Sequence, residues 1–182
     1  EGTFNAAFVP SYTSELIKGK TKSNKFANEI FNLLLVGLFL IVLIVQIFMP
    51  IFVSLIAPGF VEDDNKMSLA IDLTRITFPF LMFVSLASFF SAILNSHNKF
   101  AAASAAPIIL NVLLILVLVF GKILNDKLVY YLSYSVSLAG FLQLLFLYSF
   151  VKTYYKFELS FKFKINNRVK FFFKKLLPSI LS

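Results

Sequence analysis

Residues 31–50 read FNLLLVGLFLIVLIVQIFMP and contain no charged side chain. They lie inside a charge-free run that extends over residues 30–61. About 20 residues of α-helix, at a rise of about 1.5 Å each, cross the roughly 30 Å hydrocarbon core of a bilayer. The run therefore predicts a transmembrane helix, which we place at residues 26–49 because Pro50 interrupts it. The remainder, residues 51–60, is then expected to be a re-entrant or interfacial piece.

Three further charge-free runs are long enough to cross a bilayer, at residues 76–96, 100–121 and 128–151. The chain of 182 residues is 59% hydrophobic and 14% charged, whereas a soluble domain is roughly 45–50% apolar and about 25% charged. This composition, together with the absence of cysteine, excludes an ordinary soluble domain, a disordered chain and a disulfide scaffold. Short connections at residues 96–99 and 122–127 favour antiparallel neighbouring helices. The sequence therefore predicts an all-α, polytopic transmembrane helical bundle with four full spans.

The 17 Lys and Arg residues fall unequally on the two sides of this bundle. One side holds only Lys66, Arg75, Lys122 and Lys127. The other side holds thirteen cations: Lys18, Lys20, Lys22, Lys25, Lys99, Lys152, Lys156, Lys162, Lys164, Arg168, Lys170, Lys174 and Lys175. The positive-inside rule places this second side in the cytoplasm, with residues 18–25 as a basic cytoplasmic loop. The excess of Lys and Arg on the cytoplasmic side of the membrane accounts for the net charge of +8. We therefore expect no nucleic-acid partner.

Residues 152–176 are predicted to form a basic cytoplasmic linker. Residues 157–165 alternate between apolar and polar side chains, a period typical of an extended segment. After Asn166, apolar residues at helical spacing stand beside Arg168 and three lysines, which indicates an amphipathic helix on the anionic leaflet. Residues 177–182 open another apolar run, and the chain begins without an initiator methionine. We therefore expect an internal part of a larger polytopic protein.

The sequence offers no catalytic constellation. Its single histidine, His97, lies in a short loop beside Lys99 and is interpreted as a solvated loop residue. The adjacent acids Glu62, Asp63 and Asp64 indicate a charged loop rather than a general acid/base pair. We therefore expect no enzyme, no cofactor and no metal site.

Four polar side chains lie in or beside the predicted spans. Asp72 and Arg75 are three residues apart, share a helix face and are placed to pair. Asn95 and Asn111 are expected to form hydrogen bonds to neighbouring helices. For all four we favour a structural role over a role in moving a substrate or an ion. Pro79 and Pro107 are expected to kink their spans, as in transporters and also in static bundles.

Several short strings in the sequence resemble those of one known protein family. The first ten residues, EGTFNAAFVP, resemble the EGAFxxAFVP signature of the MurJ/MviN family of lipid II flippases, in the MOP exporter superfamily. Further matches follow in order: APGF at residues 57–60, LTRITFPFLMFVSLASFFSAILN at residues 73–95, KFA at 99–101 with APIILN at 106–111, and LPSIL at residues 177–181. Thr3 replaces the alanine of the signature, a mild departure.

This resemblance implies fourteen helices in two lobes around a cavity that exposes the headgroup of lipid II alternately to each side. Residues 1–17 would be the cytoplasmic end of the second helix, residues 26–151 the third to sixth helices, and residues 177–182 the start of the seventh. It also implies a multi-pass protein of the bacterial inner membrane. The implied partners are lipid II or a related polyprenyl-diphosphate lipid, membrane lipids and the remainder of the parent chain.

The resemblance does not supply the residues of a substrate site. The cavity arginines of the family lie mostly outside these residues, so the remaining candidates are Glu1, Asn95, Asn111, Asp72 and Arg75. The resemblance implies flipping of the lipid-linked peptidoglycan precursor for cell wall synthesis. The alternatives are a drug or ion antiporter of the same superfamily, another polyprenyl-linked glycan exporter, or a membrane scaffold that transports nothing.

Overall fold

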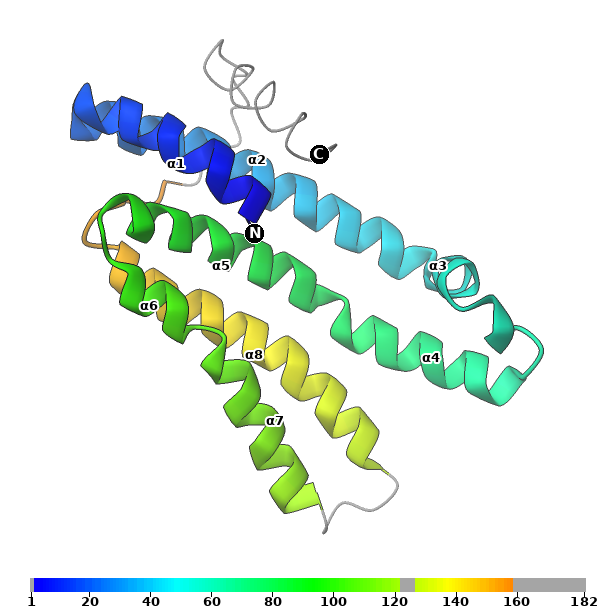
Figure 1. The fold of residues 1–182 in the computed structure, drawn as a ribbon. Helices are drawn as coiled ribbons and strands as arrows, with labels where there is room; N and C mark the ends of the chain where they lie inside the picture. Colours follow the sequence, from blue (N-terminus) through cyan, green and yellow to red (C-terminus); the bar gives the residue numbers. More distant parts are fainter. Residues whose placement is uncertain (1, 122–126, 159–182) are drawn as a thin grey trace. The chain divides into compact units, whose positions relative to one another are not determined.

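The computed structural model describes residues 2–121 and 127–158, and the regular elements in those ranges are all helices (Figure 1). In chain order they are α1 (Gly2–Ile17), α2 (Lys20–Ile47), α3 (Met49–Ile56), η1 (Pro58–Phe60), α4 (Asp64–Thr77), α5 (Pro79–Ser96), α6 (Phe100–Ala105), α7 (Ile108–Phe120) and α8 (Leu128–Val151). Four helical stretches of this described part are long and apolar enough to cross a membrane: Lys20–Ile47, Asp64–Ser96, Phe100–Phe120 and Leu128–Val151. The predicted all-α transmembrane bundle is therefore confirmed, and the chain is a multi-pass membrane protein.

The first spanning helix begins earlier than residue 26, where the sequence predicted its start. Residues 20–25, expected as a loop, form the first turns of α2. The break from α1 is made by Gly19, which has a φ of 123° that favours glycine. The N–H groups of Lys22 and Ser23 donate to the Gly19 carbonyl, at 3.0 and 3.2 Å. Lys20, Lys22 and Lys25 therefore lie on the start of a helix, whereas Lys18 lies in the turn between α1 and α2.

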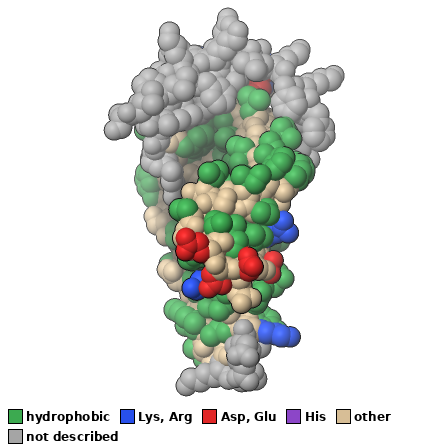
Figure 2. Space-filling model, turned by 90° about the vertical axis from the view of Figure 1, so that its right-hand side faces the viewer, with side chains coloured by type: hydrophobic (Ala, Val, Ile, Leu, Met, Phe, Trp, Pro, Cys, Tyr) green, Lys and Arg blue, Asp and Glu red, His purple; other side chains and the backbone are tan. Residues whose placement is uncertain are grey.

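The second spanning stretch also begins earlier, at Asp64 instead of residue 76. Asp63 caps α4, because its carboxylate accepts a hydrogen bond from the Lys66 N–H at 3.1 Å. The Lys66 ammonium lies 3.0 Å from the same carboxylate, and these bonds to Lys66 lower the pKa of Asp63. Figure 2 shows acidic side chains grouped among hydrophobic ones on the face that it views. Part of the expected charged loop is thus the start of a helix.

The break between α4 and α5 follows from Pro79. Proline has no N–H, so the carbonyl of Arg75 loses its bond within the helix. The Gln46 side chain of α2 donates to that carbonyl at 2.8 Å, and the Ser137 hydroxyl of α8 donates to the adjacent carbonyl of Ile76. Since a bilayer core offers no water to exposed backbone groups, these two side chains make the break tolerable in a spanning helix.

The chain divides into two compact units, which we describe separately. The first unit takes the residues up to Val36, Ser85–Ala106 and the described residues from Leu144, and the second takes Gly37–Val84 and Pro107–Gln143.

The core of the first unit is aromatic. Phe8 is fully buried, and its ring centroid lies 5.0 Å from that of Phe89 and 6.0 Å from that of Phe26. Phe31 stacks on Phe90 at 5.4 Å. Phe8 belongs to the string EGTFNAAFVP, so an aromatic position of that signature serves as a packing residue.

The second unit combines a small core with an apolar exterior. Met49, Val53 and Phe78 form the core, so that α3 packs against the end of α4. α3 overlaps residues 51–60, the piece expected to be re-entrant or interfacial. A Cβ added at Gly140 in α8 would come within 2.7 Å of Phe80 in α5, which shows close packing of these helices. The exposed large hydrophobic residues of α7 include Ile108, Val112, Ile115, Leu116, Leu118, Val119 and Phe120. Such an exterior suits contact with lipid. Pro107 separates α6 from α7, at a position where the sequence predicted a kink.

Candidate functional site

The predicted polar residues Asp72 and Arg75 both lie on α4 in the second unit. Asp72 is exposed on α4, where its carboxylate accepts a 3.5 Å hydrogen bond from the Tyr130 hydroxyl. Arg75 is also exposed on α4. The ion pairs within residues 2–121 and 127–158 are Lys18–Glu15 and Lys66–Asp63, so the expected pairing of Asp72 with Arg75 is not formed there.

The two asparagines also differ from expectation. Asn95 is half-buried at the end of α5 in the first unit, whereas Asn111 is exposed on α7 in the second. Within the described ranges, neither amide side chain forms a hydrogen bond to another helix. Glu1, residues 122–126 and the predicted amphipathic helix after Asn166 lie outside the described residues.

A different group of asparagines, in the first unit, forms a network of hydrogen bonds. Asn24, Asn28 and Asn32 recur every four residues on α2 and therefore share one helix face. We call them the asparagine row. Their amides bond the backbone of the segment that follows α8, at Lys156 and Glu158. The spacing was visible in the sequence, but a partner so far along the chain was not.

Each member of the asparagine row forms hydrogen bonds to the backbone of Lys156, of Glu158 or of both. Asn24 donates to the Lys156 carbonyl at 3.1 Å and accepts from the Lys156 N–H at 2.9 Å. Asn28 donates to the same carbonyl at 3.0 Å and accepts from the Glu158 N–H at 2.9 Å. Asn32 donates to the Glu158 carbonyl at 3.1 Å. Side chains of a helix thus supply bonds that a neighbouring strand would otherwise provide.

Tyr155, which directly precedes Lys156, completes this network. Its side chain is 1% exposed, and its hydroxyl donates to Asn28 Oδ1 at 2.5 Å. Burial raises the pKa of Tyr155 far above its ordinary value. The hydroxyl therefore stays protonated and remains a donor at physiological pH.

His97 lies in a neighbouring aromatic group of the first unit. Its ring stacks on Tyr154 with centroids 4.5 Å apart, and its Nε2 lies 3.3 Å from the Tyr12 hydroxyl. Burial, and next the charge of Lys20, lower the pKa of His97 below its ordinary value. The residue expected to be solvated is thus a half-buried, largely neutral imidazole that contacts Tyr12 of α1 and Tyr154 of the turn after α8.

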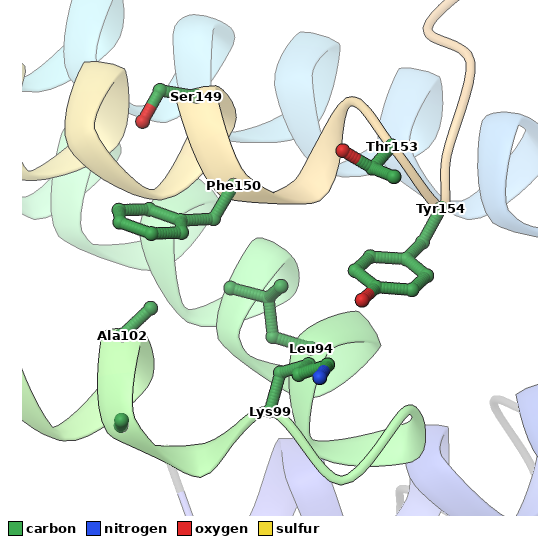
Figure 3. A pocket seen from close by; sticks show the side chains of 8 residues that line it. Leu94, Lys99, Ala102, Ser149, Phe150, Thr153 and Tyr154 are labelled. Carbon is green, nitrogen blue, oxygen red and sulfur yellow. The ribbon is translucent and has the colours of Figure 1, made fainter.

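Beside this group the structure forms a pocket of about 370 Å³. It is lined by Leu94, Lys99, Ala101, Ala102, Ser149, Phe150, Thr153 and Tyr154, as Figure 3 shows. Lys99 and the hydroxyls of Thr153 and Tyr154 supply hydrogen-bond donors, whereas the Ser149 hydroxyl donates to the Phe146 carbonyl at 2.6 Å. The other lining residues are apolar. Sequence reasoning did not find this pocket, because its residues come from three separate stretches of the chain.

Comparison with known proteins places these features in context. The family model described as "Lipid II flippase MurJ" matches residues 1–182. A probable lipid II flippase MurJ of Rickettsia prowazekii is 40% identical over 153 residues, which cover 84% of this chain and 30% of the relative. One from Rhizobium tropici is 41% identical over 81% of this chain and 29% of its own. One from Helicobacter pylori is 33% identical over 100% of this chain and 42% of its own. The chain thus spans about three tenths of the length of the first two relatives.

Proposed function

The chain belongs to the MurJ family of lipid II flippases, and we propose on that basis that it takes part in moving a lipid-linked peptidoglycan precursor across the bacterial inner membrane. The observation that carries the proposal is the match of the family model to every residue of the chain. The three relatives named above are all described as probable lipid II flippases. Their descriptions favour this cargo over the drugs or ions of an antiporter.

The proposed movement needs no covalent chemistry from this chain. The polyprenyl tail of such a precursor can stay in the hydrocarbon, so only its polar headgroup has to cross. In the alternating-access mechanism that we propose, helices rock around a cavity that opens to one side at a time. Spanning helices interrupted at Pro79 and Pro107, with the first break bonded by neighbouring helices, suit a bundle of this kind.

We further propose that the first unit lies on the cytoplasmic side. The turn at residues 18–19, the turn at residues 97–99 and residues 152–158 all belong to that unit. Lys99, Lys152 and Lys156, together with the four lysines at residues 18–25, give these segments their positive charge. This grouping of cations supports the orientation that the positive-inside rule predicts.

Depletion of the full-length protein tests the proposed cargo. In cells without a redundant flippase, we expect less precursor to reach the outer leaflet, and re-expression should restore it. A copy carrying Lys22→Gln, an exposed residue of α2, controls for expression and should restore transport equally. Precursor that still reaches the outer leaflet at the normal rate after depletion would contradict the proposal.

A further inference from the structure

The pocket beside α8 lies at the ends of spanning helices. α8 ends at Val151 and the third spanning stretch begins at Phe100, so the pocket forms where these apolar helices give way to polar turns. At such depths a bilayer changes from hydrocarbon to headgroups. All of its lining residues belong to the first unit.

The lining is divided in the way that an amphipathic ligand requires. Leu94 is buried, and together with Phe150 and Ala102 it gives the pocket an apolar surface. In the view of Figure 3, the ammonium of Lys99 and the hydroxyl of Tyr154 lie toward one side, away from Phe150 and Ala102. A molecule with one anionic end and one apolar end can satisfy both sides at once.

Charge decides the class of headgroup. Lys99 is exposed and is the one cation among the eight lining residues, which include no carboxylate. An ammonium and the Thr153 and Tyr154 hydroxyls are suitable donors for phosphate oxygens. The cationic end of a zwitterionic headgroup would find no acidic partner among the lining residues. The stacking of His97 on Tyr154 also holds one hydroxyl donor in place.

We propose that this pocket binds one anionic glycerophospholipid of the surrounding bilayer, with its phosphate at Lys99 and the nearby hydroxyls and an acyl chain against Phe150 and Leu94. Its volume of about 370 Å³ falls within the roughly 300–1,000 Å³ of small-molecule sites. The ligand is a lipid of the bilayer rather than the cargo, so the proposal goes beyond flipping and does not depend on it.

The test is lipid binding by the purified full-length protein in a neutral detergent, measured by native mass spectrometry. The probes are phosphatidylglycerol, phosphatidylcholine and inorganic phosphate. Loss of one cation near an anionic lipid corresponds to about a fivefold change in affinity. We therefore expect Lys99→Gln to weaken phosphatidylglycerol binding about fivefold, while Lys22→Gln, which changes an exposed lysine outside the pocket, leaves it unchanged.

A second variant examines the apolar part of the pocket. Ala102→Leu fills it and should reduce binding of both phospholipids, whereas Lys99→Gln should reduce mainly that of phosphatidylglycerol. Equal effects of Lys99→Gln and Lys22→Gln would overturn the proposal, as would equal binding of the two phospholipids by the wild type. Inorganic phosphate that displaces phosphatidylglycerol at equal concentration would show an anion site instead of a lipid site. Because binding is measured without transport, these outcomes are independent of the proposed flipping.

Discussion

Asn28 is 7% exposed in α2, and its amide bonds Tyr155, Lys156 and Glu158. Replacement by leucine would leave the Tyr155 hydroxyl and the Glu158 N–H without these partners, whereas the Lys156 carbonyl would keep its bond from Asn24. A buried polar group that loses its partner costs about 1–3 kcal/mol. We therefore expect Asn28→Leu to lower the free energy of unfolding by at least that amount, measured as a lower denaturation midpoint of the full-length protein in detergent.

Asn111 provides the matched control, since it is an exposed amide in another apolar helix. Within the described residues its side chain bonds no other helix, so Asn111→Leu should leave the midpoint unchanged or raise it. Equal midpoints for the two leucine variants would show that the bonds of Asn28 contribute no stability.

His97 makes the stability dependent on pH in a known direction. The pKa of an exposed imidazole is about 6.5, and burial lowers the pKa of His97 in the folded protein. As the pH falls through about 6.5 toward the lowered value, the unfolded chain takes up the proton first, so the folded state loses stability. We expect the denaturation midpoint of the wild type to fall between about pH 7.5 and about pH 5.5, an interval that brackets the ordinary imidazole pKa.

The variant His97→Phe separates this effect from other titrations. Phenylalanine keeps an aromatic ring against Tyr154 but binds no proton, so its midpoint should fall less over the same pH interval. An identical pH response in the variant and the wild type would rule out His97 as the origin of the effect.

Among the elements, the break between α4 and α5 gives a prediction about coupling. Gln46→Leu should destabilise the protein by about 1–3 kcal/mol, because the Arg75 carbonyl then lacks its donor. Pro79→Ala restores a backbone N–H that can bond this carbonyl within the helix. The cost of Gln46→Leu should therefore be smaller in the Pro79→Ala variant than in the wild type.

A double-mutant cycle of denaturation midpoints measures that difference. Costs that add without coupling would mean that the amide of Gln46 does not replace the helical bond lost at Pro79. Ser54, whose hydroxyl bonds the Ile51 carbonyl within its own helix, offers a control: Ser54→Ala should show no coupling to Pro79→Ala.

The helices were predictable from the sequence because apolar runs of this length have few other structures, and the bounds of Leu128–Val151 were predicted correctly. The sequence pattern predicts starts for the first two spanning helices that are too late, because charged residues at those helix ends are typical of loops. Gly19 and Asp63 mark those starts through backbone conformation and capping. The role of the asparagine row could not be predicted, because its partner is the backbone of residues 156–158. Every residue has the same backbone groups, so a sequence pattern does not reveal which of them a side chain bonds.

At the scale of the whole molecule, the absence of cysteine from the chain makes its orientation directly testable. Lys22, Lys152 and Asn65 are all exposed. With our proposed topology, cysteines at positions 22 and 152 should be shielded from an impermeant reagent added outside intact cells, and one at position 65 should react. The reverse labelling pattern would overturn the orientation.

Permeabilisation of the membrane is the control for a cysteine that fails to react because its side chain is buried in the protein. After permeabilisation all three cysteines should react, because each side chain is exposed in the folded protein. A cysteine that reacts from both sides in intact cells would contradict a single orientation.

The asparagine row recognises peptide groups and not side chains, and this has a consequence for how the sequence can drift. Lys156 and Glu158 each contribute only N–H and carbonyl groups to these bonds. Mutation can therefore exchange their charges over evolutionary time while the attachment to α2 persists. Proline is the exception at both positions, since it removes the donor. Natural selection is thus expected to act on the three asparagines and to leave the segment that they hold free to adapt to new lipid or protein surroundings.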